Sequence, residues 1–158
     1  VKDREVRIQI WDTAGQETYR SITRTYYKSS TCAFIIYDIT DRKTFANVSS
    51  WLKECREMCY KDILICLVGN KTDLEDKRVV SKEEGEKFAE DNGLIFFETS
   101  AKTGQNIEEM FFKCSGDIVA KIENGGIVVD DFTSGIKIGK YPNKAIQQNV
   151  AMKKKGCC

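Results

Sequence analysis

Short apolar runs alternate with helical repeats along this chain, and that order constrains the fold more than any other feature. The runs TCAFIIY, ILICLV and LIFF occupy residues 31–37, 63–68 and 94–97. Continuous apolar runs of this length are typical of strands buried on both faces. Because helical repeats separate them, they predict βαβ units, that is, an α/β fold with a mostly parallel sheet and helices on both faces.

Local signals mark the other elements. Asp41 is a plausible N-cap for an apolar stripe that repeats at helical spacing over residues 45–59. The sequence SKEE at 81–84 is a capping box, and another apolar stripe covers residues 107–122. Alternating apolar and polar residues predict one more strand, with a single apolar face, at residues 6–10.

The charges are unevenly distributed. Six of the 25 Lys and Arg residues follow Asp131 and none of the 24 Asp and Glu residues does, so residues 1–131 carry 19 basic and 24 acidic groups. A mildly acidic body with a basic tail argues against nucleic acid as the main partner and favours an anionic membrane surface. The chain has 158 residues, enough for one domain with a core. It contains no 18-residue apolar stretch that would predict a membrane span.

The seven cysteines do not form a disulfide framework, because no two of them have C-x-x-C spacing. Cys32 and Cys66 lie within apolar runs, where cysteine acts as a small hydrophobic residue. Cys55 and Cys59 are four residues apart in a helical repeat, but the chain has no histidine, so a metal site is not the favoured interpretation. The usage is typical of a protein from a reducing, cytosolic compartment.

Polar clusters follow three of the predicted strands directly. They are DTAGQ at 12–16, GNKTD at 69–73 and TSAK at 99–102. In an open parallel sheet, ligands bind outside the carboxyl ends of the strands, so these clusters are expected at one edge facing one site. Each cluster alone is also ordinary turn chemistry, since Asn, Asp, Gly and Ser favour turns.

The set WDTAGQE, GNKTD and ETSAK resembles the Ras superfamily of small GTPases. The segments YYKSS, FIIYDIT, TF and WL are similar to the Rab branch, and GLIFFETSAKTGQNIEE with the tail's SGIKIG is similar to its Rab-two subgroup. The resemblance runs from Arg4 to Ile122. It implies a P-loop-NTPase-type fold, with a GTPase domain over residues 1–122 and a hypervariable tail over 123–158. Within that tail, residues 127–129 are expected to pack on the body or to add an edge strand.

The resemblance also implies how guanine is bound. Asp73 would accept the two N–H groups of guanine, which adenine does not offer as a pair. Asn70 would reach the base's N7 and join neighbouring loops, and the stem of Lys71 would cover the ring. The Ala101 N–H would reach guanine O6. Two further residues would shape the opposite wall of the base site: Ser100 and Lys102.

A phosphate-sensing switch over residues 15–28 is implied by the same resemblance. Asp12 would hold Mg²⁺ through water, the Gly15 N–H would meet the γ-phosphate, and Gln16 would orient the attacking water. An aromatic pair is expected to face effectors or, alternatively, to pack in the core: Trp11 and Tyr26.

The tail ends in Cys157-Cys158, which resembles the doubly geranylgeranylated end of Rab proteins. Two lipid chains anchor stably where one does not, and Lys153–Lys155 would add attraction to an anionic leaflet. Ile136-Lys137-Ile138 resembles the element offered to the Rab escort protein. The implied partners are that escort protein, geranylgeranyl transferase, the GDP-dissociation inhibitor, exchange and activating proteins, and effectors. The implied place is the cytosolic face of early secretory or Golgi membranes, with the escorted protein in the cytosol.

The phosphate-binding pattern G-x-x-x-x-G-K-[ST] does not occur in the sequence, and neither does the family's first switch. We therefore expect an N-terminally incomplete Rab protein that lacks the first strand, P-loop and first helix. Alone, it is expected neither to fold stably nor to hydrolyse GTP, although the complete protein would do so. The alternative is a non-catalytic, prenylated interaction module that competes for escort or effector proteins.

Overall fold

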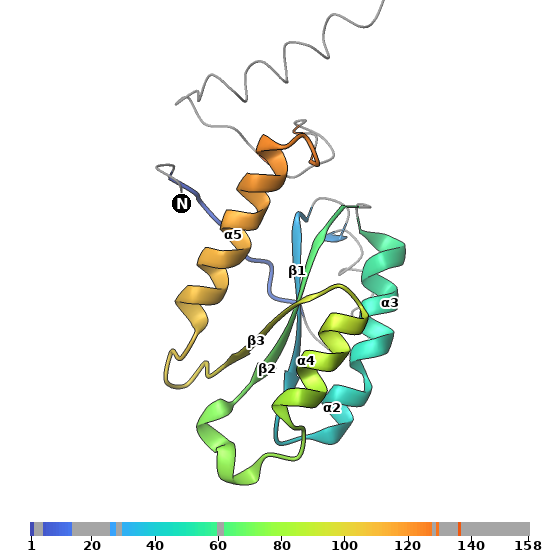
Figure 1. Ribbon diagram of the computed structural model, residues 1–158, viewed down its shortest axis with the longest axis vertical. Helices are drawn as coiled ribbons and strands as arrows, with labels where there is room; N and C mark the ends of the chain where they lie inside the picture. The colour runs from blue at the N-terminus through green and yellow to red at the C-terminus, as the bar shows by residue number, and fades with distance from the viewer. Residues whose placement is uncertain are drawn as a thin grey trace, which may run out of the picture.

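A computed structural model describes residues 1, 5–13, 26–27, 30–59, 62–127, 129 and 136. Its elements alternate as the apolar runs predict, with helices between parallel strands (Figure 1). In chain order they are β1 (Cys32–Asp38), α2 (Arg42–Ala46), α3 (Val48–Met58), β2 (Leu64–Asn70), the 3₁₀ helix η2 (Thr72–Lys77), α4 (Lys82–Asp91), β3 (Ile95–Thr99) and α5 (Ile107–Glu123).

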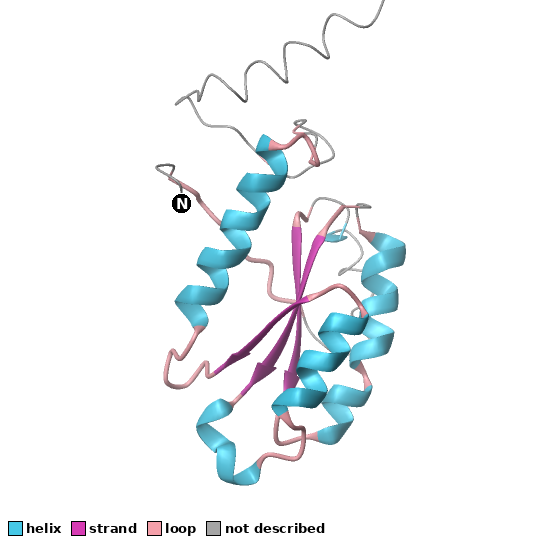
Figure 2. Ribbon diagram, viewed as in Figure 1, coloured by secondary structure: helices cyan, strands magenta, loops and turns pink. Residues whose placement is uncertain are grey.

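The sheet has the order β1-β2-β3 and all three strands run in the same direction, as Figure 2 shows. Cys32 pairs with Leu64 at the start of β1, and Asp38 pairs with Asn70 at its end. Asn70 in turn pairs with Thr99 at the end of β3. The three carboxyl ends therefore meet at one edge of the sheet, as the sequence predicts.

Helices cover both faces of the sheet, which confirms the α/β prediction. α2, α3 and α4 lie on one face and α5 lies on the other (Figure 1). The central strand β2 shows the physical reason, because its apolar side chains alternate between two separate cores and are buried in both. Ile65 and Leu67 pack toward the first face, and three residues pack toward α5: Leu64, Cys66 and Val68.

The predicted helix starts are confirmed. The Asp41 side chain accepts from the Lys43 N–H and caps α2, and the Ser81 hydroxyl accepts from the Glu84 N–H and caps α4. The stripe over residues 45–59 is divided between two helices, because α2 ends at Ala46 and α3 begins at Val48, with Asn47 between them. Within the predicted tail, Ile127 is buried, so the chain packs on the body just beyond α5.

The predicted strand at residues 6–10 is wrong. Residues 5–13 form no strand, and the three apolar side chains Val6, Ile8 and Ile10 are exposed. An alternating segment becomes a strand only where a neighbouring strand and an apolar layer receive it. The edge strand β1 likewise exposes 59% of Ile36, on the face that α5 covers elsewhere.

Candidate functional site

Two loops that follow β2 and β3 are bonded together at the carboxyl edge of the sheet. The Asn70 Oδ1 accepts from the Ala101 N–H at 3.1 Å and from the Thr99 hydroxyl at 3.4 Å. A backbone N–H needs an acceptor, which fixes the orientation of the Asn70 amide. Since Oδ1 has two lone pairs, its acceptor capacity is filled and the Nδ2 amino group remains to donate to a ligand. Asn70 therefore joins the two loops, as the resemblance implies.

Asp73 is held rigidly in the same place. Ser100, which is 0% exposed, donates its hydroxyl to Asp73 Oδ1 at 2.6 Å. Lys102 Nζ lies 3.8 Å from the other carboxylate oxygen, and the Asp73 side chain is only 13% exposed. Two carboxylate oxygens offer about four lone-pair positions, so both retain capacity for further donors. Asp73 is thus a positioned, nearly buried carboxylate with the capacity to accept two parallel N–H bonds.

The loop after β3 is closed by its own bonds. The Ser100 hydroxyl also accepts from the Thr103 N–H at 3.1 Å, and the Gly104 N–H donates to the Ser100 carbonyl at 2.9 Å. The Thr72 hydroxyl donates to the Gln105 side chain at 2.9 Å, which adds a second link between the loops. The fully buried Ser100 is the centre of this loop, and its hydroxyl links the loop to Asp73.

Lys71 adopts a left-handed backbone conformation, with φ 72° and ψ 36°. This region is unfavourable for a residue with a side chain and is concentrated at functional sites. Lys71 Nζ pairs with Asp38 Oδ2 at 2.6 Å, across the ends of β1 and β2. This ion pair holds the Lys71 ammonium group beyond the end of β1. The aliphatic part of the Lys71 side chain therefore lies at the sheet edge.

The sequence interpretation missed Asp38, although the strand-end rule that found the other clusters applies to it as well. Its Oδ1 accepts from both the N–H and the hydroxyl of Thr40, at 2.8 and 2.7 Å. Partial burial raises the pKa of Asp38, but hydrogen bonds from Lys71 and Thr40 outweigh it and leave that pKa below its ordinary value. The same ion pair raises the pKa of Lys71.

One contact implied by the resemblance uses a donor that is already hydrogen-bonded in the structure. The Ala101 N–H, assigned to guanine O6, donates here to Asn70. A carbonyl oxygen placed at the site would have to share that donor with Asn70 or replace it. The remaining predicted residues of the switch and the anchor lie outside the described residues: Gly15, Gln16, Lys153–Lys155, Cys157 and Cys158.

Trp11 and Tyr26, the aromatic pair expected to face effectors or to pack in the core, contact each other. Their rings are stacked with centroids 4.5 Å apart, and Trp11 remains 49% exposed. Trp11 is therefore not a core residue in this structure, and its free face leaves a contact surface for a partner.

Asp12, the implied Mg²⁺ residue, lies on the exposed segment 5–13. Within the described ranges, no group of three or more His, Cys, Asp or Glu side chains is arranged to hold a metal ion. The described contacts of the sheet edge concern the residues implied for the base: Asn70, Asp73 and Ala101.

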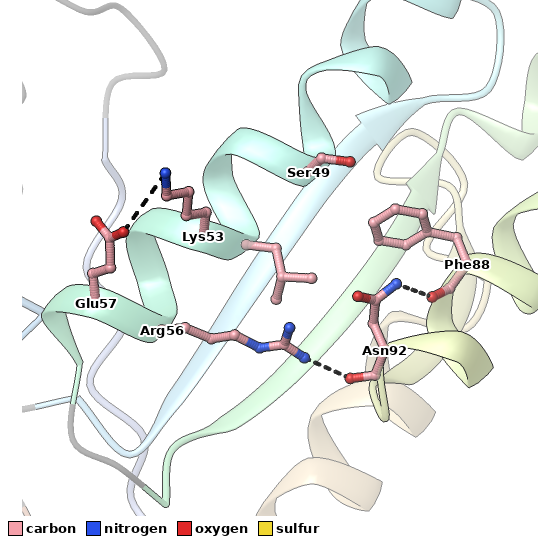
Figure 3. A pocket seen from close by; sticks show the side chains of 7 residues that line it. Ser49, Lys53, Arg56, Glu57, Phe88 and Asn92 are labelled. Carbon is pink, nitrogen blue, oxygen red and sulfur yellow. Dashed lines mark hydrogen bonds and ion pairs between the residues drawn. The ribbon is translucent and has the colours of Figure 1, made fainter.

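A separate cavity of about 400 Å³ lies between α3 and α4 (Figure 3). Arg56 donates to the Asn92 carbonyl at 2.7 Å across it, and Lys53 pairs with Glu57 at 3.9 Å along α3. None of the strand-end residues lines this cavity. Its labelled polar groups are largely paired with each other, so the candidate site is the sheet edge: Asn70, Lys71, Asp73, Ser100, Ala101 and Lys102.

Comparison with known families shows which family the chain belongs to. A profile described as the Ras family matches residues 1–120. The chain belongs to the Ras family. Members of this family are small GTPase switches that bind GTP and GDP with Mg²⁺, so the family and the geometry at the sheet edge point to the same ligand class. Among the described residues, none of the helices is both long enough and apolar enough to span a membrane.

Proposed function

We propose that this chain recognises the guanine base of GDP and GTP as part of a Rab-type switch in membrane traffic. Two hydrogen bonds support the proposal most: the Ser100 hydroxyl donates to Asp73, and the Ala101 N–H donates to Asn70, so both side chains are held in position. Guanine presents two N–H donors beside each other, and an adenine at the same place would leave the Asp73 carboxylate without matching donors. Asn70 would donate to N7, an acceptor that guanine and adenine share. Asp73 is therefore the residue that distinguishes guanine from adenine.

Hydrolysis is a separate matter from base recognition. The pattern that cradles phosphates is not present in the sequence, and backbone and lysine contacts of that loop normally hold the β- and γ-phosphates. We therefore propose that the chain alone binds guanine nucleotides weakly and does not hydrolyse GTP. In a complete switch, Gln16 would orient water and Gly15 would contact the γ-phosphate.

Equilibrium dialysis with radiolabelled GDP, GTP and ATP, followed by a phosphate-release assay, tests both statements. The expected result is weak, guanine-specific retention with similar affinity for GDP and GTP and no phosphate release. Equal retention of ATP would contradict base discrimination, and GTP turnover would contradict the second statement.

The second part of the proposal concerns the cellular location of the protein and its protein partners. Two geranylgeranyl chains on Cys157 and Cys158, with Lys153–Lys155 beside them, would anchor the chain to an anionic cytosolic leaflet of the early secretory or Golgi membranes. The escort protein, transferase and GDP-dissociation inhibitor would handle the lipids. Labelling with a geranylgeranyl donor in the presence of escort protein and transferase is expected to occur in the wild type and to fail when both cysteines are serine.

A second candidate is a non-catalytic, prenylated interaction module, and the stack of Trp11 on Tyr26 favours it. The two rings are stacked and Trp11 is 49% exposed, so this aromatic pair offers a surface that a protein partner could contact. Such a module would bind an effector or escort protein with equal affinity in the presence and absence of GDP. The switch proposal instead requires that affinity to change with the nucleotide.

A further inference from the structure

Asp38, at the carboxyl end of β1, has a carboxylate whose orientation is fixed by short bonds. Its Oδ1 accepts from the Thr40 N–H at 2.8 Å and from the Thr40 hydroxyl at 2.7 Å. Its Oδ2 pairs with Lys71 Nζ at 2.6 Å, and the Asp38 side chain is only 16% exposed. Because Thr40 holds one carboxylate oxygen, the direction in which the other oxygen meets the lysine is set by the end of β1 itself.

The backbone around Asp38 is anchored as well. The Asp38 N–H donates to the Thr44 hydroxyl at 3.0 Å, so α2 supports the end of the strand. The Ile39 N–H donates to the Asn70 carbonyl at 3.1 Å, which ties this end of β1 to the residue directly before Lys71. The carboxylate and the backbone of the lysine that it binds are therefore fixed relative to each other.

Lys71 is held at both ends of its side chain. Its backbone is left-handed, with φ 72°, and its carbonyl accepts from the Leu74 N–H at 2.9 Å. Its ammonium group is held by Asp38. The methylene groups between these two ends are not packed into the core, because the Lys71 side chain remains 52% exposed. An immobilised, half-exposed apolar stem thus directly follows Asn70 in the chain, and Asp73 comes two residues later.

The ion pair between Asp38 and Lys71 acts mainly through this immobilisation. A pair that includes a half-exposed lysine adds little free energy by charge attraction, because water screens it. A free lysine, in contrast, has many rotamers, and ordering one such side chain when a ligand binds weakens the affinity by about two- to tenfold. A lysine that Asp38 has already ordered avoids this loss.

We propose that Asp38 is a positioning residue of the base site, which holds Lys71 extended so that its methylene groups cover one face of a purine ring. The inference rests on the guanine recognition proposed above. Contact with a ring face does not distinguish guanine from adenine, whereas the Asp73 carboxylate does. Asp38 therefore contributes to the affinity for a nucleotide, and Asp73 contributes to the choice of base.

A double-mutant cycle separates positioning through Lys71 from a general structural role of Asp38. Equilibrium dialysis with radiolabelled GDP is carried out on the full chain, in the presence of trimethylamine N-oxide, for the wild type, Asp38→Asn, Lys71→Met and the double variant. Methionine keeps an unbranched apolar side chain without an ammonium group. Each single variant is expected to weaken GDP binding by about two- to tenfold, and Asp38→Asn is expected to add no further loss to Lys71→Met.

Asp117→Asn is the matched control, because Asp117 pairs with Lys113 Nζ at the same 2.6 Å within α5. GDP binding by this variant is expected to stay at the wild-type level. Equal losses from Asp38→Asn in the presence and absence of Lys71 would overturn the positioning role, and so would unchanged GDP binding by Asp38→Asn. Absence of GDP binding by the wild type would instead refute the proposed function, and the positioning role with it.

A measurement on the wild type decides the matter where a variant fails to fold. A purine ring that lies on the Lys71 stem shifts the methylene proton resonances of that side chain upfield in a ¹³C–¹H correlation spectrum, because of the ring current. GDP is expected to produce this shift at Lys71 and not at Lys113. Shifts of the Ala101, Lys102 and Thr103 amides without it would show a base bound away from the Lys71 stem, which would overturn the proposal.

Discussion

Ser100 offers the sharpest test of the idea that the sheet edge is a preorganised acceptor for a base. Replacement by alanine removes the hydroxyl that donates to Asp73 Oδ1 at 2.6 Å, in a position that is fully buried. A hydrogen bond to a charged group contributes about 1.5–3 kcal/mol. The hydroxyl also accepts from the Thr103 N–H, but Thr103 is exposed and water can replace that bond. Ser100→Ala is therefore expected to cost about 2 kcal/mol of folding stability.

Ser115→Ala is the matched control. Ser115 is also a buried serine, but its hydroxyl donates to the Phe111 carbonyl within α5, at 2.6 Å. Such a bond duplicates one that the helix already makes, and alanine favours the helix, so the change is expected to be near neutral. The comparison therefore isolates the bond to Asp73 from the general effect of losing a buried hydroxyl.

Urea unfolding followed by far-UV circular dichroism measures both variants. A fixed concentration of trimethylamine N-oxide raises the stability of the folded state, which keeps the comparison possible for a marginally stable chain. With an m-value of about 1–1.5 kcal/mol/M, a loss of about 2 kcal/mol lowers the midpoint by about 1.5 M. If Ser100→Ala unfolds at the same midpoint as Ser115→Ala, the Ser100–Asp73 bond does not hold the site and the reasoning fails.

Three further changes test other parts of the molecule. Asp73→Asn replaces an acceptor by an amino donor and is expected to move binding from guanine to xanthine nucleotides, by roughly 1–3 kcal/mol of relative affinity in equilibrium dialysis; unchanged preference would contradict the role of Asp73. Because the pKa of Asp38 is lowered in the folded state, its ion pair with Lys71 stabilises the fold above about pH 4 and is lost as pH falls further. Asp38→Asn is thus expected to flatten the acid limb of a stability–pH curve, and a curve of unchanged slope would be evidence against it. Gly69→Ala would put a methyl group 2.8 Å from the Tyr37 hydroxyl oxygen, and overpacking of this kind costs about 1–3 kcal/mol. That hydroxyl is buried with no hydrogen-bond partner in the described structure, so Tyr37→Phe is expected to be neutral or stabilising alone and to rescue part of the Gly69→Ala loss in a double-mutant urea series.

Much of the fold follows from local signals that act in the same direction. Three apolar runs are long enough to form a strand and apolar enough to be buried on both faces of a sheet: 31–37, 63–68 and 94–97. A strand forms in each of them. The caps at Asp41 and Ser81 need only their own hydrogen bonds to neighbouring N–H groups, so the sequence alone located them.

Features that depend on a distant partner were not predictable in the same way. Residues 6–10 have the alternation of a strand, but no strand pairs with them in the described structure. The ion pair of Asp38 with Lys71 and the packing of Cys32 and Cys114 in one core depend on strand register and helix placement, which periodicity does not reveal. The break at Asn47 divides one apolar stripe between two helices without interrupting its spacing.

For the site, the resemblance implied the residues, and the structure shows how these residues are bonded to one another. Ser100, which is expected to shape a wall of the base site, is fully buried and donates its hydroxyl to Asp73. Ala101 was expected to bind the base, and its N–H is engaged by Asn70. These differences arise because neighbouring polar groups satisfy one another before any ligand does.

Guanine binding at the edge formed by Asn70, Asp73 and the loop after Ser100 is the proposal on which the rest depends. The most direct measurement is an ¹⁵N–¹H correlation titration of the labelled chain with GDP and, in parallel, with ADP. Guanine-specific binding at this edge predicts saturable shifts of the Ala101, Lys102 and Thr103 amides with GDP, their loss in Asp73→Ala, and no shift with ADP. Equal shifts with both nucleotides, or GDP-induced shifts that leave these three amides unmoved, would contradict it.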